Sequence, residues 1–192
     1  MREATVTRKT KETDITVTLR FDGKGESKIS TGIGFFDHML TAMAKHSGIS
    51  MNVRAEGDLH VDGHHTVEDT GIVIGQALMQ ALGDKSGIAR YGSAYIPMDE
   101  ALSFCALDLS NRPFTVFRGE FSNQMIGDYD ACLTEEFFRA LAVNAGITLH
   151  LDMCWGKNDH HKCEALFKAF AHALKTAVQE TDGTTLSTKG AL

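Results

Sequence analysis

Two stretches of the chain combine histidine and glutamate at a spacing that suits a metal site. His64-His65 is followed by Glu68, and His160-His161 is followed by Glu164, so the pattern His-His-x-x-Glu occurs twice. The two copies are in register (160 − 64 = 96 and 164 − 68 = 96). Each copy opens an apolar stretch with helical periodicity, which predicts that both motifs lie in the first turn of a helix.

On a helix, side chains three or four positions apart share a face, whereas neighbours point about 100° apart. Each motif can therefore direct one imidazole and its carboxylate at one ion and leave its other histidine for a second ion. Such a ligand set, without thiolate, suits manganese, iron or zinc. A single copy would be explained equally well by the preference of helix N-termini for polar and acidic residues. Two copies favour metal binding, in a dinuclear centre or as two separate ions.

Two further residues at equivalent positions are candidate ligands. His38 and Glu136 each lie near the start of a predicted helix and are 98 residues apart (136 − 38 = 98). The glycines predicted to end these helices, Gly48 and Gly146, have the same separation (146 − 48 = 98). The alternatives are a structural or capping histidine at position 38 and an exposed first-turn glutamate at position 136.

Other polar residues suggest an anion site and acid–base groups. Arg90, Arg112 and Lys189 lie beside turns, where they are either surface charges or a phosphate anchor, since guanidinium binds phosphate bidentately. Glu12 and Glu100 precede strands at matching positions (100 − 12 = 88) and suit acid–base work or simple solvation.

The remaining histidines give weaker signals. His46, His60 and His150 could each be structural or exposed, and we expect His172 to be structural. The stretch 183–190 has no periodicity, which by itself is typical of disorder.

Composition narrows the class of protein. The 192 residues carry a net charge of −6, which argues against nucleic acid or an acidic membrane as partner. No apolar run approaches a membrane span, and the N-terminus lacks the apolar core of a signal peptide. The four cysteines have neither disulfide-framework nor zinc spacing. We therefore expect a cytoplasmic protein that binds neither nucleic acid nor membranes.

The order of predicted elements repeats. Strands are predicted at 4–21, 27–30, 49–53, 93–97, 101–109, 114–118 and 147–152, and helices at 35–45, 64–82, 133–144 and from the second motif to about Glu180. This indicates an α/β (α+β) fold made by internal duplication of two ββαβα halves, with two small mixed β-sheets enclosing a helical layer. We predict one compact domain, 1–192, built of repeats at about 1–90 and 91–192. Gly71 and Gly75, four apart, predict a close helix–helix contact.

The motifs together resemble a known family. Phe35-Phe36-Asp37-His38-Met39-Leu40, the run 57–69 with the first motif, Pro97-Met98-Asp99-Glu100 and the run 156–168 with the second motif are similar to imidazoleglycerol-phosphate dehydratase of histidine biosynthesis. The resemblance extends from Arg8 to Gly190. It implies a hydro-lyase that dehydrates D-erythro-imidazole glycerol phosphate to imidazole acetol phosphate, using two Mn²⁺ ions per active site. It further implies a homo-oligomer, a closed shell of 24 subunits with active sites between subunits.

Residue by residue, the resemblance assigns roles. The implied metal ligands are His38, His64, His65, Glu68, Glu136, His160, His161 and Glu164. The implied substrate contacts are Glu12, His46, Arg90, Arg112, Lys168, Ser187, Thr188 and Lys189. Glu12 is the candidate proton carrier, and His46 the candidate proton shuttle to the departing hydroxyl.

Glu136 departs from the family pattern, which commonly has histidine there. Either the ligand has been lost or carboxylate has replaced imidazole; the duplication favours replacement. Two readings from other classes stay open, namely a metal-storage oligomer without catalysis and a dinuclear phosphate-ester hydrolase.

Overall fold

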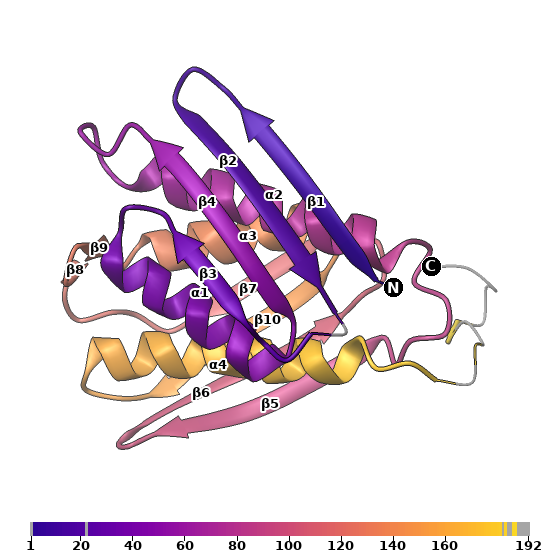
Figure 1. The fold of residues 1–192 in the computed structure, drawn as a ribbon. Helices are drawn as coiled ribbons and strands as arrows, with labels where there is room; N and C mark the ends of the chain where they lie inside the picture. The colour runs from indigo at the N-terminus through magenta and orange to yellow at the C-terminus, as the bar shows by residue number, and fades with distance from the viewer. Residues whose placement is uncertain (1, 22, 182, 184–185, 188–192) are drawn as a thin grey trace.

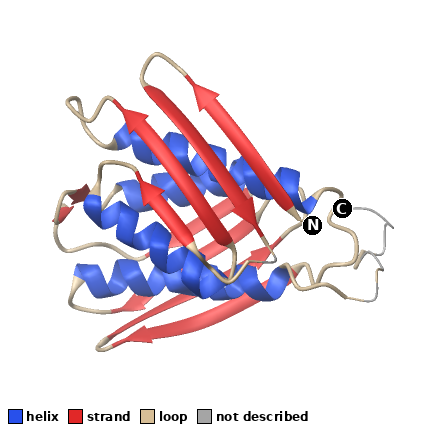
Figure 2. Cartoon of the chain, viewed as in Figure 1, coloured by secondary structure: helices blue, strands red, loops and turns tan. Residues whose placement is uncertain are grey.

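Alternating apolar residues build two four-stranded sheets, and a layer of four helices lies between them (Figures 1 and 2). The computed structural model describes residues 2–21, 23–181, 183 and 186–187. In the strand that carries Ile15, Val17 and Leu19, every second side chain is fully buried against the helices. Within the described residues, no helix combines the length and the apolar character needed to cross a membrane.

The first half forms one sheet with the strand order β1-β2-β4-β3, in which only β3 and β4 pair in parallel. Its elements are β1 (Glu3–Lys9), β2 (Thr13–Arg20), β3 (Ser27–Ser30), α1 (Gly34–Ser47), β4 (Ser50–Gly57) and α2 (His64–Leu82).

The second half repeats this design, with the strand order β5-β6-β10-β7 and a parallel pairing of β7 with β10. Its elements are β5 (Tyr91–Met98), β6 (Ala101–Asp108), β7 (Phe114–Arg118), β8 (Met125–Ile126), β9 (Tyr129–Asp130), α3 (Leu133–Ala145), β10 (Thr148–Trp155) and α4 (Asp159–Ala177). The structure thus confirms the predicted fold of two similar halves whose mixed sheets enclose a helical layer.

Several details differ from the prediction. The stretch 4–21 is two antiparallel strands, β1 and β2, joined by a turn in which the Thr10 hydroxyl accepts hydrogen bonds from the backbone N–H groups of Glu12 and Thr13. This turn contains neither glycine nor proline, so the sequence carried no strong signal for it. Each half is therefore βββαβα, with a small β8–β9 hairpin added in the second. Helix α4 ends at Ala177 rather than near Glu180.

The helices pack as two parallel pairs. In the α1–α4 pair, His38 contacts Glu164 and His46 contacts His172, so both helices advance by eight residues between the contacts. In the α2–α3 pair, Glu68 lies beside Glu136 and Gln76 contacts Asn144, which gives the same advance. All four helices start at the left-hand end of the molecule in Figure 1. Their partly positive N-termini therefore gather at one end, where carboxylates are favoured.

Gly71 and Gly75 lie where α2 meets α3, as the sequence predicted. A Cβ atom at Gly75 would stand 2.6 Å from the carbonyl oxygen of Leu141, which is backbone and cannot turn aside. The missing side chains therefore allow the two helices to approach closely.

Gly75→Ala should consequently destabilise the protein. Helix propensity alone would add about 1 kcal/mol of stability, whereas forcing α2 and α3 apart costs about 1–3 kcal/mol. We expect a lower thermal midpoint by calorimetry, with Gln80→Ala on the exposed side of α2 as a control that changes little. A rise in the midpoint of Gly75→Ala would contradict the packing role.

Candidate active site

The first turns of α2 and α4 are held by polar side chains that precede them. The Asn158 side-chain oxygen accepts hydrogen bonds from the backbone N–H groups of His160 (2.9 Å) and His161 (3.4 Å). In the first half, a carboxylate oxygen of Asp62 accepts one from the N–H of His64 (2.8 Å). These caps satisfy N–H groups that a helix leaves unpaired and fix the directions of the motif histidines.

The α1–α4 triad consists of His38, His160 and Glu164, whose ligand atoms all lie within 4.8 Å of one another. Nε2 of His38 lies 3.1 Å, and Nε2 of His160 3.0 Å, from the same oxygen of Glu164. Burial raises the pKa of Glu164, but hydrogen bonds from Lys168, His160 and His38 outweigh it and lower the pKa to about 2. The carboxylate therefore stays ionised near neutral pH, as a metal ligand must.

The α2–α3 triad consists of His64, Glu68 and Glu136, again with ligand atoms within 4.8 Å of one another. Nε2 of His64 lies 3.5 Å from Glu68, and Glu136 forms an ion pair with Arg139 one turn further along α3. In each triad the third residue comes from the other half of the chain. His38 of the first half joins the second motif, and Glu136 of the second half joins the first.

The second histidine of each motif lies outside these triads and faces acidic side chains. Nδ1 of His65 lies 3.1 Å from Asp58, and its Nε2 lies 3.9 Å from Glu12. Hydrogen bonding to Asp58 raises the pKa of His65. A hollow of about 390 Å³ opens beside Glu12 and Asp58.

His161 is held in a comparable way. Its Nδ1 lies 2.8 Å from Glu100, and its Nε2 3.8 Å from Asp99. The hydrogen bond with Glu100 raises the pKa of His161 and, with backbone N–H groups, lowers the pKa of Glu100 to about 2. A carboxylate on one ring nitrogen fixes the orientation of the other, as in many histidine–metal sites.

Further along the α1–α4 pair lies a row of basic side chains. Nζ of Lys168 is 2.6 Å from the second oxygen of Glu164. Beyond it, Nδ1 of His46 lies 3.1 Å from Nε2 of His172. Burial, followed by the charge of Lys168, lowers the pKa of His46. His46 is therefore neutral near neutral pH and able to accept a proton.

Arg90, Asp108 and Arg112 form a cation corner at the opposite end of the molecule. Arg90 donates to both oxygens of Asp108, from Nε at 2.7 Å and from Nη2 at 3.0 Å, and Arg112 approaches the same carboxylate at 3.3 Å. Arg90 is 7% exposed and has a left-handed backbone with φ of 71°, a conformation rare for residues other than glycine. Such strain is common at functional sites.

The C-terminal stretch reaches the same corner. Nη1 of Arg90 donates to the carbonyl oxygen of Leu186 at 2.5 Å, directly before Ser187. Thr188 and Lys189, the other predicted tail contacts, lie outside the described residues. The structure thus brings Arg90, Arg112 and the start of the tail together.

The cation corner and the second motif are far apart within one chain. Arg90 precedes β5 and Glu100 follows it, and the eight residues of this strand span about 25 Å. His161 contacts Glu100, so the imidazole end and the guanidinium end of the predicted site are separated by roughly the length of β5. A small molecule cannot touch both ends of one subunit.

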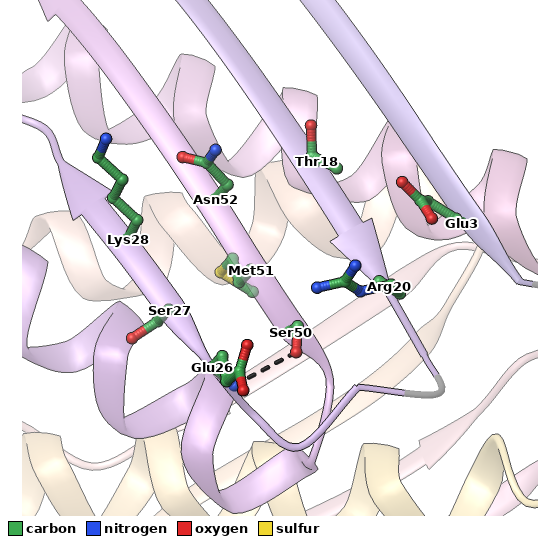
Figure 3. A pocket seen from close by; sticks show the side chains of 9 residues that line it. All are labelled: Glu3, Thr18, Arg20, Glu26, Ser27, Lys28, Ser50, Met51 and Asn52. Carbon is green, nitrogen blue, oxygen red and sulfur yellow. Dashed lines mark hydrogen bonds between the residues drawn. The ribbon is translucent and has the colours of Figure 1, made fainter.

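A separate hollow of about 390 Å³ lies on the outer face of the first sheet (Figure 3). Lys28, Asn52 and Thr18 stand on neighbouring strands there, and the N–H of Glu26 donates to the hydroxyl of Ser50 at 3.2 Å. Among the described residues, none of the predicted site residues lines this hollow. It is not the candidate site.

Sequence reasoning missed several acidic partners. Asp58 and Asp99 contact motif histidines, and Asp108 holds both arginines. Each lies at the end of a strand or in the turn that follows it. Asp58 and Asp99 belong to stretches that carry the family resemblance but had no role assigned there, and only the neighbours in space show what each residue contacts.

Comparisons with known proteins identify the same family that the sequence motifs resemble. The family model for imidazoleglycerol-phosphate dehydratase matches residues 31–174. The chain is 57% identical to the imidazoleglycerol-phosphate dehydratase of Listeria welshimeri and 55% identical to that of Acetivibrio thermocellus, covering all of this chain and at least 99% of each relative.

Solved structures agree. The imidazoleglycerol-phosphate dehydratase of Staphylococcus aureus superposes with a TM-score of 0.85 at 43% identity, covering 93% of this chain and 99% of that one. The Pyrococcus furiosus enzyme, solved in complex with (S)-C348, gives a TM-score of 0.86 at 37% identity, covering 97% and 100%.

The duplicated fold and these matches define the class of the protein as a hydro-lyase. The chain belongs to the imidazoleglycerol-phosphate dehydratase family.

Proposed function

We propose that this enzyme dehydrates D-erythro-imidazole glycerol phosphate to imidazole acetol phosphate in histidine biosynthesis, as a metal-dependent hydro-lyase with two Mn²⁺ ions per active site. The observation that supports this most directly is the pair of equivalent triads. Each contains at least one imidazole and one carboxylate within 4.8 Å, contributed by two helices.

The residues present fit divalent metal ions. The His38, His160 and Glu164 set and the His64, Glu68 and Glu136 set would each hold one ion. His65 and His161, which lie outside these sets, would be additional ligands. Nitrogen and hard oxygen donors together suit manganese. Bound ions supply polarisation of the substrate's imidazole ring, which eases loss of its N–H proton.

The chain's own groups handle protons and the phosphate. Glu12, 3.9 Å from His65 and beside an open hollow, is placed to carry a proton. His46, with its lowered pKa, is suited to shuttle a proton to the departing hydroxyl. Lys168 lies between the α1–α4 triad and His46 as a substrate contact. Arg90, Arg112, Ser187, Thr188 and Lys189 bind the phosphate.

The active site is shared between subunits in this proposal. One substrate cannot span β5 to reach both the second motif and the cation corner, so these ends must come from different subunits. Large apolar side chains next to the motifs, Val61 (61% exposed) and Trp155 (63% exposed), suit contacts with neighbouring copies. We propose a closed shell of 24 cytoplasmic subunits, each a single domain of repeats 1–90 and 91–192.

One assay tests the function. Purified enzyme is incubated with imidazole glycerol phosphate and Mn²⁺, and both the ketone product and inorganic phosphate are followed. Dehydration forms the ketone and keeps the phosphate ester, whereas a phosphate-ester hydrolase would release phosphate. Storage without catalysis would produce neither, so either of these outcomes would overturn the proposal.

Arg112 gives a specific test of the phosphate contact. Arg112→Gln should lower kcat/KM at least about tenfold, since a hydrogen bond to a charged group contributes roughly 1.5–3 kcal/mol. Metal content should be unchanged. Arg54→Gln is the matched control, because Arg54 is similarly exposed and also has one carboxylate partner, Glu56. If the two variants had equal kcat/KM, Arg112 would be a surface charge rather than a phosphate contact.

A further inference from the structure

Each of the two parallel helix pairs has a side-chain contact at the equivalent position, but the residue types differ between the pairs. In the α1–α4 pair this contact joins His46 and His172, 3.1 Å apart. In the α2–α3 pair it joins Asn144 and Gln76, 3.4 Å apart. The residues correspond through the duplication (172 − 76 = 96 and 144 − 46 = 98), with the same offsets as the metal motifs and the helix-ending glycines.

The comparison separates packing from chemistry. Because an amide pair fills this position in one half, the helix pair does not require imidazole rings there. Lys168 next to the histidines corresponds to Ile72 in the other pair (168 − 72 = 96), so the row of basic groups occurs in the α1–α4 pair and not at the equivalent places in α2–α3. The two halves share their metal-ligand design but differ in this row.

We infer that His172 is a positioning residue for the dehydration, which holds Nδ1 of His46 in one hydrogen-bonded arrangement so that His46 presents Nε2 to the substrate. The inference rests on the proposed function. Between two neutral imidazoles one nitrogen must donate and the other accept, so the contact couples the tautomers of the two rings and keeps Nδ1 of His46 occupied. The sequence had indicated only a structural histidine at this position.

The charges around His46 fit this role. The groups that act on it electrostatically are Lys168, His172, Glu164 and Lys175. Burial and the two nearby lysines lower the pKa of His46 and outweigh the opposing effect of Glu164, so His46 remains a neutral ring. Its orientation is therefore set by a hydrogen bond rather than by an ion pair. His172, from the facing helix, provides that bond.

Glutamine and phenylalanine at position 172 test the inference. His172→Gln keeps a hydrogen-bonding group of a type that the fold already uses at Gln76, and should retain kcat/KM within about twofold. His172→Phe keeps an aromatic ring but cannot bond to Nδ1, and should lose about five- to tenfold. Metal content and particle size should match wild type in both, and Gln76→His should change nothing.

A double variant shows whether His172 acts through His46. In a His46→Gln background, adding His172→Phe should change kcat/KM less than about twofold, because the partner is already gone. Full activity of His172→Phe, equal losses in the Gln and Phe variants, or multiplying effects in the double variant would each overturn the inference.

A readout independent of turnover keeps this result distinct from the proposed function. Solid-state ¹⁵N spectra of sedimented, histidine-labelled protein should show a hydrogen-bonded Nδ1 of His46 in wild type and His172→Gln, and loss of that hydrogen bond in His172→Phe. Wild-type protein without dehydratase activity would refute the proposed function. An Nδ1 signal of His46 that is the same in wild type and His172→Phe would refute the positioning role instead.

Discussion

Glu136→Ala should remove one metal ion per subunit and lower kcat/KM by more than about a hundredfold. Loss of a group that only supports a metal ligand already costs about 10–100-fold, so loss of a direct ligand should cost more. The geometry supports this role, since Glu136 lies with His64 and Glu68, and the buried rings of Phe137 and Phe138 set the rotation of α3. Elemental analysis and steady-state kinetics on purified variants measure both effects.

Three matched variants isolate the ligand role of Glu136. Glu136→His should keep both ions, because imidazole is an equivalent donor for these metals. Glu135→Ala removes an exposed neighbour and should do little. Arg139→Gln removes only the ion pair with Glu136, so it distinguishes loss of that pair from loss of a metal ligand. Full metal occupancy and activity in Glu136→Ala would show that Glu136 is not a ligand.

Removal of the metal should have the second large effect, on both activity and particle size. Treatment with a chelator should abolish turnover and reduce the particle from its assembled size, because the active sites proposed between subunits lose their ions. Light scattering and an activity assay before and after dialysis measure both changes. An active, metal-free enzyme of unchanged size would contradict the proposed metal dependence and shared sites.

The subunit itself should remain folded during this treatment. The core lies between the two sheets and is built of apolar side chains, whereas the triads sit at the helix N-termini at one end. Far-ultraviolet circular dichroism should therefore change little while the particle dissociates. Mn²⁺ should restore size and activity, and Mg²⁺, which disfavours imidazole ligands, should not. Loss of the helical signal on chelation would show that the subunit needs the metal in order to fold.

The faces and the ends of the helices could be predicted from the sequence. The spacing of each His-His-x-x-Glu motif sets which side chains share a helical face, and His160 and Glu164 do meet one turn apart. Gly48 and Gly146 end α1 and α3 in left-handed conformations, as predicted. Matching offsets between the halves predicted two sheets of the same design. These are short-range properties, which depend on neighbours within a few positions along the chain.

Which helices pack against each other could not be predicted from the sequence. Periodicity shows which face of a helix is apolar but not which helix it will meet. Only the packing of α1 on α4 and α2 on α3 places His38 with the second motif and Glu136 with the first. The contact of His46 with His172, and the meeting of Arg90, Arg112 and Leu186 at the cation corner, likewise join residues far apart in sequence.

The duplication alone therefore predicted the kinds of candidate ligand and their equivalent places in the two halves. The tertiary structure decided the partners, because each triad draws its residues across the interface between the halves. It also placed the cation corner a strand's length from the second motif. The physical reason is that side-chain direction within a helix follows from local geometry, whereas the choice of neighbour depends on the shapes that two faces present, such as the close approach allowed by Gly71 and Gly75.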